Sequence, residues 1–283
     1  MNKLLALLLL FALAVQAQDK QPYQLYTKDG KKTTYKKLLK KAGEAQVVLF
    51  GEYHDNSLVH WLQLEFTKDM SAQKYLVLGA EMFEADNQDE LQQYLDGKID
   101  QKALDTVARL WSNYKTDYKP IVDYAKDNNI PFIATNVPRR YASQVYKQGL
   151  ESLGLLSEEE KSWIAPLPIP YDGTLPGYKK MMEMMGGHGG GENMPKAQAI
   201  KDATMAHFIT ENIKDDYVFI HFNGTYHSDN FEGISWYLKQ NDPDVKVITI
   251  SSVSQKDISK LEEENKEKAD FILVVDEDMT KTH

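Results

Sequence analysis

Two short stretches of the sequence place a histidine just after an apolar run. The first is FGEYHDN, residues 50–56, and the second is FNGTYHSDN, residues 222–230. Both contain glycine, any residue, tyrosine and histidine in that order, so His54 and His227 occupy matching positions. An imidazole can bind a metal ion or exchange a proton near neutral pH. The repeated spacing therefore predicts one site to which both histidines contribute.

Two carboxylates accompany these histidines. Glu52 lies two residues before His54, and Glu81 ends a third apolar run. Two neutral imidazoles and the Glu81 carboxylate would form the two-histidine, one-carboxylate set that holds Zn²⁺, Mn²⁺ or Fe²⁺ and leaves positions open for water. Glu52 could then orient a ligand or act as the general base on a bound water. His54, Glu81 and His227 are thus candidate metal ligands, and these three with Glu52 are candidate catalytic groups of a hydrolase.

A purely structural role for the same residues is the alternative. His54 and His227 could be buried and satisfied by neighbouring carboxylates, while Asp55 and Asp229 cap the helices that follow. The two roles are compatible, because one loop can begin a helix and also present its histidine.

Short apolar runs of strand length alternate with longer segments of helical pattern. The expected strands are residues 47–50, 75–78, 131–134, 217–222, 245–250 and 271–275. Most of these runs are apolar throughout, which is typical of strands covered on both faces. The expected helices are residues 57–70, 87–95, 102–114, 119–128, 197–212, 233–239 and 255–268. This alternation predicts an α/β fold in three layers, with a mostly parallel sheet flanked by helices.

Polar groups follow four of the expected strands: residues 51–54, Glu81, Asn136 and residues 224–227. In an open α/β sheet, ligands bind at the carboxyl ends of the parallel strands. If these strands are neighbours, both histidines and one or two glutamates lie together in one site at the carboxyl ends of the strands. Gly51 and Gly224 would then let the backbone turn sharply or approach a ligand closely.

Residues 140–196 break the alternating pattern. This segment begins with a helical piece, continues through a proline-rich loop and ends in a stretch rich in methionine and glycine. It predicts a helical insert over one edge of an α/β core formed by residues 18–139 and 197–283.

The first 17 residues have the pattern of a cleavable signal peptide. A short basic start precedes an apolar stretch from Leu4 to Val15, and Val15 and Ala17 are small residues before a cleavage point. The sequence therefore predicts an exported protein of the periplasm or cell envelope. It contains no cysteine, so it has no disulfide, no thiolate metal site and no lipid-bearing cysteine after the signal peptide.

The charge balance argues against one class of partner. The formal net charge is −9, whereas a nucleic-acid-binding protein needs a basic surface to neutralise phosphates. We therefore expect no nucleic-acid partner.

Five blocks of sequence together resemble the ChaN-like family of exported haem-binding proteins, part of the wider Tiki, TraB and erythromycin-esterase group. The blocks are VVLFGEYHDNSLVHWLQLEF, GAEMFEADNQDELQQYLDG, ATNVPRR, AQAIKDATMAHFI and FNGTYHSDNFEGISWYL, which lie in the family's order between residues 47 and 250. The resemblance implies a helical subdomain on an α/β core, haem held by a tyrosine ligand, and a dimer that can bring haems together. In the Tiki and TraB branch, the residues that match His54, Glu81 and His227 are associated with metal-dependent proteolysis. Known ChaN-like proteins include lipoproteins, which this cysteine-free chain does not resemble.

The segment GYKKMMEMMGGHGGGENM, residues 177–194, can be interpreted with haem in mind. Haem needs a flat apolar slot, an axial donor, and cations for its propionates. The expected haem contacts are Tyr178 or His188 as the donor, Met181, Met182 and Met185 in the slot, and Arg139 and Arg140 beside the propionates. The alternative is that the methionines pack a short helix on the core and that His188 lies in a glycine loop without a role.

The sequence thus favours an exported protein that binds haem or iron in haem or iron acquisition. Its expected partners are haem, envelope transport components and a second copy of the chain. The competing hypothesis is a metal-dependent hydrolase that uses His54, Glu81 and His227. A hydrolase with a nucleophilic side chain is disfavoured, because the chain has neither a cysteine nor a Gly-x-Ser-x-Gly elbow.

Overall fold

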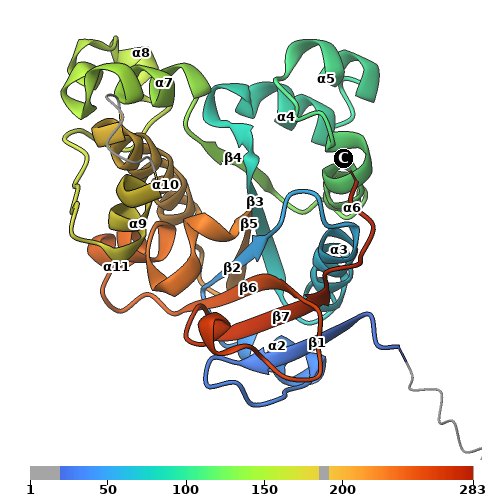
Figure 1. Cartoon of the computed structure of the whole chain (residues 1–283). Coiled ribbons are helices and arrows are strands. Elements are labelled where there is room, and N and C mark those ends of the chain that lie inside the picture. Colours follow the sequence, from blue (N-terminus) through green and yellow to red (C-terminus); the bar gives the residue numbers. More distant parts are fainter. Residues whose placement is uncertain (1–19, 185–190, 283) are drawn as a thin grey trace, which may run out of the picture.

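The computed structural model describes residues 20–184 and 191–282, and its centre is a seven-stranded sheet (Figure 1). The strands are β1 (Tyr23–Thr27), β2 (Val47–Glu52), β3 (Tyr75–Glu84), β4 (Phe132–Asn136), β5 (Tyr217–Gly224), β6 (Val247–Gln255) and β7 (Phe271–Asp276). They lie in the order β1-β7-β6-β2-β5-β3-β4, and every pair is parallel except β1 with β7. The expected α/β fold with a mostly parallel sheet is confirmed.

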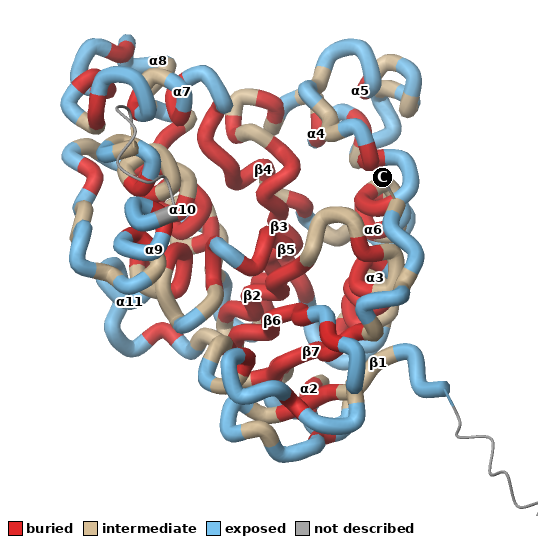
Figure 2. Tube along the Cα trace, viewed as in Figure 1, coloured by how far each residue is buried: buried red, intermediate tan, exposed pale blue. Residues whose placement is uncertain are grey.

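Helices cover both faces of the sheet. They are α2 (Tyr35–Ala42), α3 (Ser57–Ser71), α4 (Gln88–Leu95), α5 (Gln101–Val107), α6 (Lys119–Asp127), α7 (Arg139–Gln148), α8 (Glu158–Lys161), α9 (Pro176–Met184), α10 (Met194–Asn212) and α11 (Ile234–Asn241). Alternate residues of β2 enter different cores: Val48 and Phe50 pack with α2, α3 and α6, while Val47 and Leu49 pack with α7, α10 and α11. The buried sheet between exposed helical surfaces is visible in Figure 2. Because both faces of the strands are covered, most residues of the central strands β2, β3 and β5 are apolar.

The described chain between β4 and β5 is mostly helical, with a proline-rich loop between α8 and α9. Helices α7, α8, α9 and α10 lie here, and α9 and α7 both contact α10 (Figure 1). Helix α10 in turn packs on β4. This arrangement puts α10 beside the carboxyl ends of the central strands. No helix in the described residues is long and apolar enough to cross a membrane.

Two elements near the start of the described chain were not expected from the sequence. Strand β1 pairs antiparallel with β7 at one edge of the sheet. Helix α2 begins after Thr34, whose side chain accepts a hydrogen bond from the Lys37 amide. Its basic residues lie outward while Leu38 and Ala42 are buried, so a stretch dominated by lysines still forms an amphipathic helix.

The helix expected at residues 102–114 was too long. Helix α5 ends at Val107, and a π-helical turn, residues Tyr114–Tyr118, follows after a bend. The cause is a set of contacts with the end of β3: the Arg109 amide donates to the Asn87 side chain, and the Arg109 guanidinium pairs with Glu84 and Asp86. These bonds require the chain to leave the helical path.

No α-helix forms at residues 255–268, where a helix was expected, although a short 3-10 turn spans Glu263–Asn265. Strand β6 continues to Gln255, whose buried side chain then organises the loop. Its amide donates to the Asp257 and Lys260 carbonyls, and its Oε1 accepts from the Glu262 amide and the Asn265 side chain. One polar side chain thus satisfies several loop groups that a helix would have satisfied internally.

Candidate functional site

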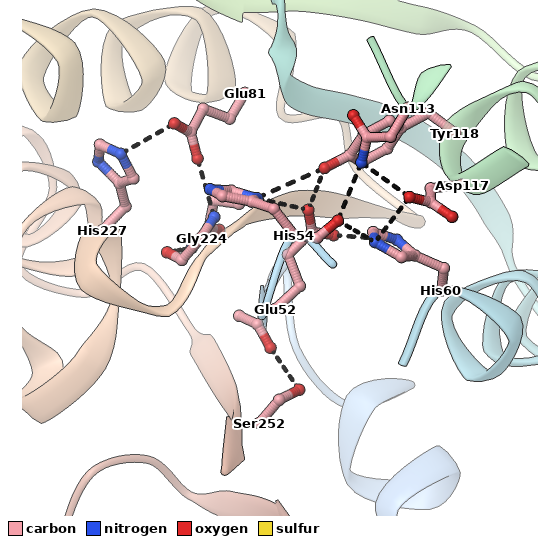
Figure 3. Close-up of polar contacts among 12 residues, drawn as sticks. Glu52, His54, His60, Glu81, Asn113, Asp117, Tyr118, Gly224, His227 and Ser252 are labelled. Carbon is pink, nitrogen blue, oxygen red and sulfur yellow. Dashed lines mark hydrogen bonds and ion pairs between the residues drawn. The ribbon is translucent and has the colours of Figure 1, made fainter. Parts of the chain in front are cut away.

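A cavity of about 780 Å³ opens at the carboxyl ends of β2, β5 and β3. Because these strands are neighbours in that order, the loops after them meet at one place. Glu52, His54, Glu81 and His227 all line the cavity, and Figure 3 shows how they lie around Gly224. The structure therefore brings together the four residues that the sequence predicted to converge.

Glu52 and His54 form a hydrogen-bonded pair. His54 Nδ1 lies 3.0 Å from Glu52 Oε1. The Glu52 carboxylate is buried, and it also accepts hydrogen bonds from Tyr118 Oη at 2.5 Å and Gln63 Nε2 at 2.7 Å. His54 itself is 41% exposed at its side chain. A buried, fully satisfied carboxylate thus orients a histidine that reaches the cavity.

The pKa values in this pair follow from burial and hydrogen bonding. Burial opposes the Glu52 charge, but the field of His60 and the hydrogen bonds from His54 and Tyr118 outweigh it and lower the Glu52 pKa. Burial also opposes protonation of His54, but its bond to Glu52 and the field of Glu81 outweigh that effect and raise the His54 pKa. His54 is therefore more basic than an ordinary histidine.

The loop that carries His54 is fixed from two sides. Asn56 caps α3 by accepting hydrogen bonds from the first amides of that helix, so the structural alternative in which Asp55 caps it is wrong. The His54 carbonyl oxygen accepts from Asn113 Nδ2 at 2.9 Å and His60 Nε2 at 3.0 Å. The Trp111 ring packs edge-on against the His54 ring, with 4.9 Å between their centroids. The sequence-based interpretation did not include these supporting residues.

His227 lies between two buried carboxylates. Its Nδ1 is 2.5 Å from Asp202 Oδ1, and its Nε2 is 3.1 Å from Glu81 Oε1. Burial opposes the charged imidazole, but the fields of Glu81 and Asp202 outweigh burial and raise the His227 pKa to about 9. His227 is therefore an imidazolium at neutral pH that holds two carboxylates together.

Both oxygens of Glu81 have partners. Oε1 accepts from His227, and Oε2 accepts from the Gly224 amide at 2.8 Å. Burial would raise the Glu81 pKa, but the His227 charge and hydrogen bond and the field of His54 lower it instead. Glu81 thus remains ionised and joins the end of β3 to the end of β5.

This arrangement does not fit the metal site expected from His54, Glu81 and His227. Both ring nitrogens of His227 are bonded to carboxylates, whereas a metal ligand needs a neutral imidazole with a lone pair directed at the ion. Within residues 20–184 and 191–282, no group of three or more His, Cys, Asp or Glu side chains is placed to hold a metal ion.

Tyr178 does not occupy the position expected of a haem ligand. It is 4% exposed, its ring stacks on Tyr171 with centroids 5.5 Å apart, and its hydroxyl donates to Asp202 Oδ2 at 3.2 Å. Burial and the Asp202 charge raise the Tyr178 pKa. Tyr178 therefore supports His227 through Asp202, from behind the cavity.

Of the three methionines expected to line a haem slot, one lies at the cavity. Met181 lines the cavity, whereas Met182 is 40% exposed and is not part of its lining. Met185 and His188 lie outside the residues that the structure describes. The candidate donor His188 therefore stays a prediction.

The two arginines expected beside propionates have different surroundings. Arg140 Nη1 pairs with Asp86 Oδ2 at 2.6 Å, and its guanidinium lies over the rings of Tyr141 and Trp163. Arg139 lies on α7 at a smaller cavity beside the main one. Only Arg139 is thus placed near the site.

A family model described as haem-binding uptake, Tiki superfamily, ChaN, matches residues 38–238. The match covers well over half of the chain. The chain belongs to the ChaN family of the Tiki superfamily. The resemblance seen in the sequence is thereby confirmed.

The solved structures include a ChaN protein of similar fold. The structure of cofacial haem binding to ChaN of Campylobacter jejuni superposes with a TM-score of 0.68, at 15% identity, over 89% of this chain and 96% of that chain. The type III effector HopBA1 superposes with a TM-score of 0.49, at 12% identity, over 84% and 91% of the two chains. The likeness to the Campylobacter protein shows that this chain has the ChaN fold.

One curated relative shares part of the sequence. Protein RETICULATA-RELATED 5, chloroplastic, of Arabidopsis thaliana is 28% identical over 147 residues, which are 48% of this chain and 19% of the relative. The chain therefore spans about a fifth of that relative's length.

The cavity residues fit the ligand of the ChaN family in kind. Met181 and Met194 provide apolar lining, Tyr226 and His54 provide possible axial donors, and Lys201 provides a cation. Tyrosine and histidine are both established haem ligands. The kinds of side chain in this lining therefore suit haem, whereas the histidine and carboxylate arrangement does not suit a divalent metal ion.

Several cavity residues were missed in the sequence. Gln198 and Lys201 come from α10, as does Asp202, which contacts His227 without lining the cavity, and all three lie within the block AQAIKDATMAHFI. The signal was a charged residue, Asp202, amid small and apolar residues of a helical pattern. Tyr53 and Tyr226 also line the cavity, and their signal was the tyrosine shared by the two repeated motifs.

Proposed function

We propose that this protein binds haem in the cavity at the carboxyl ends of β2, β3 and β5, and that it serves haem or iron acquisition. The observation that carries the proposal is a cavity of about 780 Å³ in a ChaN-family chain. Its volume lies in the range of small-molecule and cofactor sites. Histidine, tyrosine, methionine and lysine side chains, which suit haem, line it together.

Tyr226 is the axial donor that we propose. It lines the cavity, and half of it, 51%, is exposed, although it is a large aromatic residue. It also occupies the tyrosine position of the second repeated motif, directly before His227. A bound haem would supply an iron centre that a phenolate oxygen can hold. His54, which reaches the same cavity, is the second donor to test.

Haemin titration of the purified protein tests this proposal. We expect a saturable visible absorption band that changes in Tyr226→Phe and stays unchanged in Tyr178→Phe, because Tyr178 lies behind the cavity. A band altered by His54→Ala and not by Tyr226→Phe would move the donor to His54. Absence of a saturable band in the unmodified protein would refute haem binding.

The Glu52 and His54 pair favours a second candidate function, hydrolysis without a metal ion. A buried carboxylate that holds one imidazole nitrogen leaves the other to accept a proton from water, as a general base does. Gly224, whose amide donates to Glu81, lies directly beside the His54 ring. Ester hydrolysis that persists in chelator and is lost in His54→Ala would support this function. Equal activity of the variant and the unmodified protein would exclude it.

Export and assembly belong to the same proposal. We propose that residues 1–17 direct export and are removed, so that the protein acts in the periplasm or cell envelope with transport components there. We propose also that the haem-loaded protein forms a homodimer. N-terminal sequencing of protein recovered from the envelope fraction tests cleavage after Ala17, and light scattering with and without haemin tests the dimer.

A further inference from the structure

A second, smaller cavity adjoins the proposed haem site. It has a volume of about 350 Å³ and lies between α7 and α10, which contact each other on one face of the sheet (Figure 1). Met194, Gln198 and Lys201 of α10 line both cavities. The two spaces are therefore neighbours across the surface of one helix, and we name the smaller one the α7/α10 groove.

The α7/α10 groove is positively charged. Arg139 and Lys147 enter its lining from α7 and Lys201 enters from α10, and its lining contains no aspartate or glutamate. This is a concentration of positive charge on a chain whose net charge is −9. Within the described part of the chain, no ion pair involves any of these three cations. The groove thus offers positive charge to an external anion.

The cations of the groove differ in what they neutralise. Burial raises the pKa of Asp202, and the charges of His227 and, less strongly, Lys201 oppose that rise. Lys201 also adds to the effect of His227 and His54 in lowering the pKa of Glu81, so its charge already acts on two buried carboxylates of the site. Arg139 and Lys147 are exposed residues eight positions apart, on one side of α7. Their positive charge is therefore the surplus that a ligand could neutralise.

Arg140, the residue next to Arg139, has different surroundings. Its guanidinium forms an ion pair with Asp86 and lies over two aromatic rings, so its positive charge is neutralised within the protein. Arg139, the next residue along the chain, instead lines the groove. One of two consecutive arginines thus has a structural role, and the other is left for binding.

We infer that the α7/α10 groove is a carboxylate-binding subsite, which holds the acidic edge of a ligand whose flat apolar body fills the main cavity. The inference rests on the proposed haem function and extends it by fixing the ligand's orientation. The propionates would lie toward Arg139 and Lys147, and the opposite edge of the ring would lie toward Met181. Arginine and lysine bind carboxylates through charge-assisted hydrogen bonds.

Haemin and haemin dimethyl ester together test this inference. The two probes share the ring and the iron, but the ester has no carboxylate charge. The test variant is the double substitution Arg139→Gln with Lys147→Gln. The control is Lys102→Gln with Lys36→Gln, which removes the same charge from exposed positions on α5 and α2. Circular dichroism melting of each variant checks that the fold is retained.

We expect the double variant to bind haemin roughly tenfold more weakly, since two partly exposed charge-assisted contacts are lost. Its affinity for the dimethyl ester should stay within about twofold of the unmodified protein, and the control should match the unmodified protein for both probes. Added salt should weaken the binding of haemin more than that of the ester, because salt screens exposed charges.

Two results would overturn the subsite. One is equal haemin affinity of the double variant and the control, which would leave the haem function standing. The other is an equal loss of affinity for haemin and its ester, which would show that the cations act through the fold and not through ligand carboxylates. If the unmodified protein binds neither probe, the haem function fails and the subsite fails with it.

Discussion

The His54 ring lies against the backbone of Gly224. A methyl group added to Gly224 would be 2.9 Å from both Cε1 and Nε2 of His54 and 3.4 Å from Glu81 Oε2. The φ angle of Gly224 is −58°, so its conformation is open to other residues and the close approach alone requires glycine. The close approach is to a side chain of the protein, so the predicted approach of Gly224 to a ligand stays a prediction.

Gly224→Ala should therefore alter the site more than the fold. The methyl group would push the flexible end of His54 away from the β5 loop and disturb the Glu81 contact with the Gly224 amide. We expect haemin affinity to fall about tenfold or more, with a loss of less than about 2 kcal/mol in the free energy of unfolding. Gly154→Ala is the matched control, because nothing lies within 4 Å of its added methyl group. Equal haemin binding by both variants would contradict this account.

Glu52→Gln should lower the pKa of His54. The Glu52 hydrogen bond is the largest of the effects that raise that pKa, and the substitution removes the negative charge while keeping the shape. Titration of the His54 ring by NMR measures the change, and we expect the midpoint to move to lower pH. Glu65→Gln on α3, whose carboxylate pairs with Lys68 at the surface, is the control and should leave the midpoint unchanged. An unchanged midpoint in Glu52→Gln would show that other groups set the basicity of His54.

The central strands and the site loops could be predicted because burial of both strand faces leaves a local apolar pattern in the sequence. Each of these strands is covered on both faces, so it is mainly apolar and is recognisable without knowing its neighbours. Strand ends then mark the loops, and the repeated motif identifies Glu52, His54 and His227 as residues of those loops. Parallel pairing of β2 with β5 and of β5 with β3 accounts for the rest of the convergence.

The contribution of α10 could not be predicted in the same way. Asp202 reaches His227 only because α10 packs beside the ends of the strands, and no local pattern states that contact. Tyr178 was misplaced for a related reason. In sequence it is one aromatic residue in a methionine-rich helix, but its stacking on Tyr171 and its bond to Asp202 turn it inward. Tertiary packing decides which side of a short helix is buried.

Tyr178→Phe should weaken the fold slightly without changing the haem spectrum. The substitution removes the hydroxyl that donates to Asp202 and keeps the stacked ring. Loss of one buried hydrogen bond costs about 1–2 kcal/mol, which urea unfolding measures. The visible spectrum of the haemin complex should match that of the unmodified protein. A lost or shifted band in Tyr178→Phe with an intact fold would return Tyr178 to the role of axial ligand.

The folded state should lose stability as the pH rises toward 9, because His227 is more basic in the folded chain than in the unfolded one. Its pKa is 6.5 when unperturbed and about 9 between Glu81 and Asp202. A pKa raised by folding contributes stability that is complete below 6.5 and is lost as pH rises through 9. The rise corresponds to roughly 3 kcal/mol. Urea unfolding at several pH values between 6 and 9.5 measures it.

Asp202→Asn provides the comparison for that experiment. Removing one of the two carboxylates lowers the pKa of folded His227, so the decline in stability should still begin near pH 6.5 but end at a lower pH and be smaller. Groups elsewhere titrate alike in both proteins, so the difference between the two profiles isolates His227. Coincident profiles would mean that His227 does not carry the proton between Glu81 and Asp202. The assignment of His227 as an imidazolium that joins α10 to the ends of β3 and β5 would then be wrong.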